Sequence, residues 1–109
     1  MAKYLITASY TAEGTKGLLQ EGGSGRKAAI QQVMQSMGGK LEAMYYAYGD
    51  TDVVLIADMP DAASGLALSL AANASGTVKV TTTPLLTIEE VDAACKKTVA
   101  FRPAGAQGV

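Results

Sequence analysis

The sequence predicts a single α+β domain, a four-stranded antiparallel sheet with helices on one face. Segments rich in aromatic and β-branched residues alternate with helical segments in the order strand, helix, strand, strand, helix, strand. A capped helix follows the last strand. The length of 109 residues fits one domain with one hydrophobic core. This order is the βαββαβ arrangement of ferredoxin-like folds, here with an extra C-terminal helix.

The centre of the predicted sheet is a hairpin between Lys40 and Asp61. We expect its strands at residues 40–48 and 51–58, with a tight turn at Gly49 and Asp50. Both strands are apolar on both faces, which indicates that they are covered on two sides. Residues 4–10 and 77–83 also alternate as strands do.

Glycines and caps divide the helical segments. Thr11 can cap a short helical turn that ends at Gly22 and Gly23, and we expect the first long helix to begin at Ser24 and to end at Gly38 and Gly39 in a left-handed glycine cap. Pro60 and Asp61 open a second helix over residues 62–74. That helix is apolar nearly all round, so we expect it to contact the sheet and a second surface.

The last helix starts with a capping box. Thr87 and Glu90 have the spacing at which each side chain caps the other residue's backbone N–H, and we expect the helix to run to about Val99. We assign residues 1–100 to the domain and residues 101–109 to a C-terminal tail.

Composition predicts self-association. Hydrophobic residues make up 49% of the chain and charged residues only 17%, against about 25% in typical soluble domains. The sheet face without helices would be apolar on its inner strands, and such a patch is too large to leave in water. We therefore expect two copies to pack sheet to sheet as a dimeric α/β barrel, with further packing through the second helix.

Several function classes are disfavoured. The net charge of -1 provides no basic patch for nucleic acid. The chain has no histidine and one cysteine, Cys95, so we expect no metal site, no cofactor and no disulfide. No apolar run reaches the roughly 20 residues of a membrane span, and the first residues lack a signal-peptide pattern, so we expect a cytoplasmic protein without a membrane partner.

The hairpin resembles the GYD domain family. It carries a Gly-Gly-Lys segment, an aromatic strand, a Gly-x-x-Asp turn and a Pro-Asp helix start, at Gly38, Gly39, Lys40, Tyr45, Tyr46, Gly49, Asp52, Pro60 and Asp61. Thr51 stands where this family commonly has the tyrosine of its name. The resemblance implies a ferredoxin-like subunit of the dimeric α/β-barrel type and implies no reaction, since fold does not determine function.

The candidate ligand-binding residues are Arg26, Tyr46, Tyr48 and Asp52; no catalytic residue is assigned. Arg26 stands near a helix start, where the helix dipole disfavours a cation, so it needs a partner such as Asp52 or an anion. The tyrosines can line an apolar pocket or simply pack in a core. Two hypotheses stay open: a binding or assembly module, and a cofactor-free enzyme, isomerase or monooxygenase-like, acting on a small organic ligand.

Overall fold

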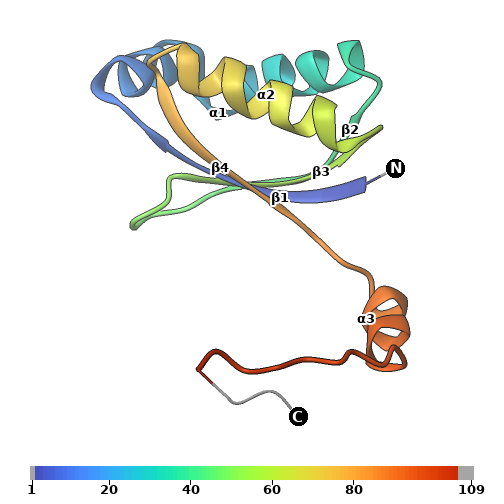
Figure 1. Cartoon of the computed structure of the whole chain (residues 1–109). Helices are drawn as coiled ribbons and strands as arrows, with labels where there is room; N and C mark the ends of the chain where they lie inside the picture. Colours follow the sequence, from blue (N-terminus) through green and yellow to red (C-terminus); the bar gives the residue numbers. More distant parts are fainter. Residues whose placement is uncertain (1, 106–109) are drawn as a thin grey trace.

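The computed structural model describes residues 2–105 of the chain, so residues 106–109 of the predicted tail lie outside the described part. The elements follow the predicted order, with a third helix at the end (Figure 1). They are β1 (Ala2–Tyr10), α1 (Ala12–Ser36), β2 (Lys40–Tyr46), β3 (Val53–Met59), α2 (Ala62–Ala74), β4 (Val78–Pro84) and α3 (Ile88–Cys95).

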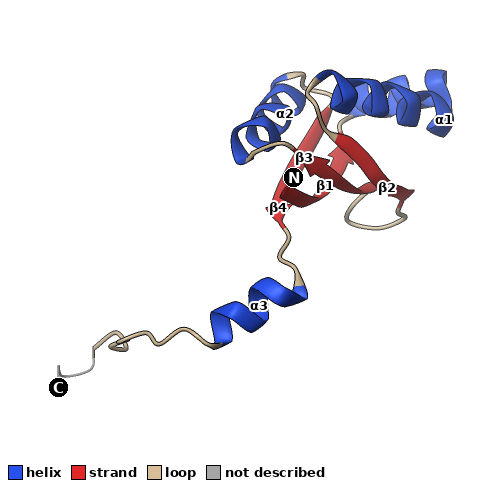
Figure 2. Cartoon of the chain, turned by 90° about the vertical axis from the view of Figure 1, so that its right-hand side faces the viewer, coloured by secondary structure: helices blue, strands red, loops and turns tan. Residues whose placement is uncertain are grey.

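The predicted antiparallel sheet of four strands is confirmed. Its strand order is β2-β3-β1-β4, and every neighbouring pair is antiparallel. The expectation that both hairpin strands are inner strands is wrong for β2, which lies at an edge because β1 pairs on the other side of β3. Helices α1 and α2 both cover one face, and the other face carries neither of them (Figure 2). The strands adjacent in sequence, β2 and β3, pair directly, whereas β1 pairs with β3 and β4, which follow it only after one or both helices.

The core lies between this sheet and the two helices. Strand alternation sends Tyr4 and Ile6 of β1 toward the helices, and their neighbours Leu5 and Thr7 toward the open face. Met34 of α1 is fully buried against this layer. Among residues 2–105, the buried hydrophobic cluster consists of Tyr4, Ile6, Met34, Val53, Leu55, Ala57 and Met59.

The central hairpin differs from its prediction at the turn. Strand β2 ends at Tyr46 and β3 begins at Val53, so residues 47–52 connect them rather than a two-residue turn. The loop is closed by a hydrogen bond from the Ala47 N–H to the Asp52 carbonyl at 2.8 Å. The Asp52 N–H in turn bonds the Ala8 carbonyl of β1 at 2.9 Å, which holds the loop against the neighbouring strand.

A register shift in β2 also departs from simple alternation. The pairing skips Glu42, between Leu41 opposite Ala57 and Ala43 opposite Ile56. After this bulge Met44 and Tyr46 share the helix side with Leu41, and Tyr45 points to the open face. Strict alternation would place Leu41 and Tyr45 on one face, whereas the bulge places them on opposite faces.

The element α1 consists of two helices that meet at a kink. The first begins at Ala12 with Thr11 as N-cap, and the predicted break occurs at Gly22, with φ 74° and ψ 170°. The second helix follows this kink directly, so the predicted division of this segment is confirmed. The left-handed glycine cap is confirmed: Gly38 has φ 77°, and the Gly39 N–H bonds the Met34 carbonyl at 2.8 Å.

Helix α2 has the predicted bounds, and Asp61 is its N-cap. The predicted capping box of α3 is present, because Thr87 Oγ1 accepts from the Glu90 N–H and the Glu90 carboxylate accepts from the Thr87 N–H, each at 3.0 Å. Helix α3 ends at Cys95 instead of near Val99.

The molecule is elongated because its C-terminal part leaves the body. Its extents are 62 × 30 × 23 Å. Beyond β4 the chain carries α3 away from the sheet, on the side opposite α1 and α2 (Figures 1 and 2). Within residues 2–105, no helix combines the length and the hydropathy needed to cross a membrane.

Candidate functional site

A cavity of about 490 Å³ lies between the sheet and the two helices that cover it. Its walls are mostly apolar and include Ile6 and Leu55 from the sheet, Ile30 from α1 and Leu68 from α2. Several residues in the cavity wall have a small side chain or none, so they leave space between the helices and the strands. They are Ala8, Gly14, Gly17, Ala29, Ala71 and Ala72. Small-molecule sites commonly have volumes of about 300–1,000 Å³, so the cavity can hold an organic ligand.

Three polar side chains meet at one end of the cavity: Tyr10, Glu21 and Arg26. Arg26 Nη1 lies 3.1 Å from Glu21 Oε2, and both side chains are partly exposed. Burial lowers the pKa of Arg26, but the hydrogen bond and charge of Glu21, together with the Tyr10 side chain, raise it above the ordinary value. Arg26 therefore remains charged, and its partner is Glu21 rather than the expected Asp52.

Tyr46 joins this cluster from β2. Its hydroxyl donates to the Gly23 carbonyl at 3.3 Å, just beyond the α1 kink. Burial raises the pKa of Tyr46, Tyr10 raises it further, and the positive charge of Arg26 opposes the shift. Tyr10, Tyr46 and Arg26 thus act on one another electrostatically, although they come from β1, β2 and α1.

A second hollow adjoins the first and shares Tyr10 and Leu18 with it. Tyr46 and Asp52 line this second hollow. The Asp52 carboxylate is engaged in the fold, since Oδ2 accepts a hydrogen bond from the Tyr10 N–H at 2.8 Å. Asp52 consequently fixes the end of β1 beside the site, which places the Tyr10 ring.

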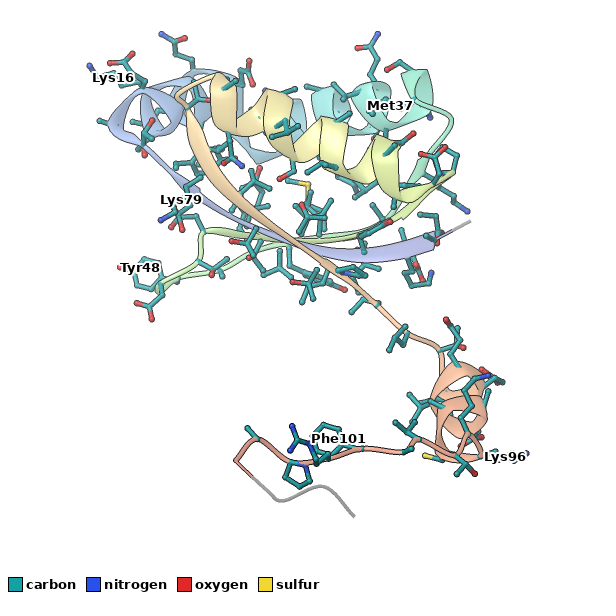
Figure 3. All side chains as sticks on the ribbon, in the orientation of Figure 1. Lys16, Met37, Tyr48, Lys79, Lys96 and Phe101 are labelled. Carbon is teal, nitrogen blue, oxygen red and sulfur yellow. The ribbon has the colours of Figure 1, made fainter. Side chains whose placement is uncertain are left out.

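The four predicted ligand-binding residues do not all line the same cavity. Arg26 lines the cavity, and Tyr46 and Asp52 line the adjoining hollow. Tyr48 lines neither: it is fully exposed in the 47–52 loop, at the far tip of the hairpin (Figure 3). Any ligand role of these residues stays a prediction.

Tyr10 and Glu21 line the cavity, but no pattern in the sequence singles them out. A helix without a break places residues five apart on different faces, so the spacing of Glu21 and Arg26 predicts no contact. The kink at Gly22 between them is the signal that could have suggested it.

The site combines an apolar cavity with groups that can form hydrogen bonds and with the ion pair between Arg26 and Glu21. Among residues 2–105, no group of three or more histidine, cysteine or acidic residues could hold a metal ion. Cys95 is exposed on α3, outside the cavity lining. The chemistry of the lining therefore suits a mainly apolar molecule with a polar group directed toward Tyr10 and Arg26.

The sequence model of the GYD domain matches residues 4–95. The chain belongs to the GYD domain family. The match extends from the first residues of β1 to the last residue of α3, so the cavity and its polar end lie inside the family domain. Neither curated proteins nor solved structures gave a match to the chain.

Proposed function

We propose that this GYD-domain protein is a homodimeric module that binds a small, largely apolar organic molecule in the cavity between its sheet and helices. The observation that carries the proposal is the cavity itself: about 490 Å³ and apolar over most of its lining, with Tyr10, Glu21 and Arg26 close together in its wall. A ligand would place its apolar part against Ile30 and Leu68 and its polar group near Tyr10 and Arg26.

The charge at the polar end favours a neutral or weakly acidic ligand group. Glu21 already balances Arg26, so a fully ionised ligand would need to displace Glu21 from the guanidinium. A carbonyl or phenolic group needs only a hydrogen bond, which the tyrosine hydroxyl or the guanidinium can donate.

The homodimer is supported by the open face of the sheet. Leu5, Val54 and Ile56 form its centre, and Tyr45 adds a side chain that is 71% exposed. At one corner Lys3 bridges Glu42 and Asp58, so these charges are paired before any partner arrives. Stacking two such faces would form the dimeric α/β barrel, and the exposed Leu66 and Leu70 of α2 offer a further contact surface.

A cavity-filling pair of variants tests the ligand site. Ala29 lines the cavity, whereas its neighbour Ala28 is exposed and lies outside the lining. We expect Ala29→Phe to weaken binding of a neutral apolar fluorescent probe such as N-phenyl-1-naphthylamine at least about tenfold, since the ring occupies the probe's space. We expect Ala28→Phe to stay within about twofold of the unsubstituted protein. Equal affinities for the two variants would contradict the proposal.

A second candidate, a cofactor-free enzyme, is favoured by the polar cluster. The Glu21 carboxylate could accept a proton, while Arg26 or a tyrosine hydroxyl stabilises the charge that develops on the substrate. Native mass spectrometry of the purified protein would identify retained ligands. Prolonged incubation would then show whether a bound ligand changes chemically, as an enzyme requires, or is released unaltered, as a binding module requires.

A further inference from the structure

The C-terminal arm, residues 86–105, is exposed over its whole described length. It nevertheless carries five large hydrophobic side chains, which are 47–77% exposed: Leu86, Ile88, Val91, Val99 and Phe101. A described segment with this many apolar side chains in water marks a contact surface rather than a solvated tail.

The interactions within α3 alone are too few to stabilise this helix in water. It has eight residues, none of them buried. Isolated helices shorter than about 12–15 residues are marginal in water, and the capping box at Thr87 and Glu90 stabilises only the first turn. Ile88 and Val91 lie three residues apart, on one side of the helix, as a docking face requires.

The root of the arm is fixed, so its direction is a property of the fold. The Leu85 N–H bonds the Lys3 carbonyl of β1 at 2.9 Å, immediately before the arm begins. From this point the chain departs on the side of the sheet that α1 and α2 leave open (Figures 1 and 2). Figure 3 shows Lys96 and Phe101 well away from the body.

We propose that the arm binds a second copy of this chain, with its apolar side chains packed on the partner's body. The inference rests on the self-association proposed above and adds the arm as the element that holds the two copies together. Two of the uncovered apolar surfaces, the sheet's open face and the arm, lie on the same side of the molecule. A second copy brings the complement of both at once, and under two-fold symmetry each arm reaches the other body.

A cross-linker can be attached specifically to Cys95, because it is the only cysteine of the chain and lies exposed at the end of α3. A maleimide–benzophenone attached to it would be photolysed in a mixture of ¹⁴N- and ¹⁵N-labelled full-length chains. We expect mixed-isotope cross-links from the arm to peptides of the partner's sheet or α2. Cross-links confined to one chain, or none to the body, would overturn the proposal.

Matched substitutions give the energetic test. We expect Val91→Ser and Phe101→Ser each to raise the dimer dissociation constant at least about tenfold in sedimentation experiments, whereas Lys96→Ser changes it by less than about twofold. Circular dichroism and probe binding in the cavity serve as checks that each variant folds.

The outcomes separate this inference from the proposals it rests on. If the serine variants dimerise as tightly as the unsubstituted protein, the role of the arm is refuted and the sheet-face dimer stands. A monomeric unsubstituted protein would refute both. Binding in the cavity is measured independently of either result.

Discussion

At the scale of single residues, two glycines of α1 show how closely the helix approaches the sheet. Gly14 lies where an added Cβ would be 1.9 Å from the Thr77 carbonyl oxygen. Gly17, one turn later, also borders the cavity, but an added Cβ would meet nothing within 4 Å. Glycine therefore has a different effect at each position. At Gly14 it allows the helix to lie against the Thr77 backbone, and at Gly17 it leaves space beside the helix.

We expect these glycines to respond in opposite directions to alanine. Gly14→Ala should lower the free energy of unfolding by roughly 1–3 kcal/mol, because the helix must move away from the Thr77 backbone. Gly17→Ala should raise it by about 0.5–1 kcal/mol, because alanine favours the helix and creates no clash. Urea denaturation of both variants measures this. A destabilised Gly17→Ala variant would show that the space beside it is not open.

The candidate site could be predicted only in part, for reasons that lie at this scale. Arg26 is a candidate because a cation near a helix start needs a partner, and Tyr46 because it is aromatic on a predicted strand. Glu21 and Tyr10 depend on the kink at Gly22 and on the Asp52 contact with the Tyr10 N–H, which are tertiary features. Tyr48 has the same residue type as Tyr46, but the loop after β2 carries it into solvent.

At the scale of elements, local signals predicted the helix caps better than the connection and register of the hairpin strands. The Asp61 cap, the glycine cap at Gly38 and the capping box at Thr87 are each formed within a few neighbouring residues. The hairpin connection and the bulge at Glu42 depend instead on contacts between strands, such as the Asp52 N–H to the Ala8 carbonyl. The periodicity of the sequence does not predict such contacts between strands that are distant in the chain.

The Asp61 cap of α2 should make stability depend on acidity. Hydrogen bonds from Ser64 lower the pKa of Asp61 below its ordinary value of 3.8. The stabilisation is therefore complete above about pH 3.8 and is lost as the pH falls from there through the lower folded-state pKa. An asparagine side chain at the same position cannot ionise, yet asparagine still caps a helix.

We expect the advantage of the unsubstituted protein over Asp61→Asn in urea midpoint to shrink as the pH is lowered from 6 toward 2. The reason is that the Asp61 carboxylate becomes protonated in this range, whereas an asparagine side chain at this position keeps its charge state. A difference that stays constant with pH would mean that the charge of Asp61 contributes nothing to the cap.

At the scale of the whole molecule, the open face of the sheet and the arm are two apolar surfaces that the described chain leaves uncovered. The open face of the sheet was expected from the apolar pattern of the hairpin strands, and the strand pairing confirms which residues form it. The exposure of the arm was not expected, because an eight-residue helix with a good cap does not reveal from sequence alone where it docks. Together these surfaces leave a single copy poorly protected from water.

Sedimentation equilibrium of the full chain at micromolar concentration tests the central claim, that copies of this protein shield one another, most directly. We expect a species of twice the 11.2 kDa chain mass, with dissociation only on dilution or on substitution in the arm. A folded protein that sediments at 11.2 kDa across that range would contradict the claim.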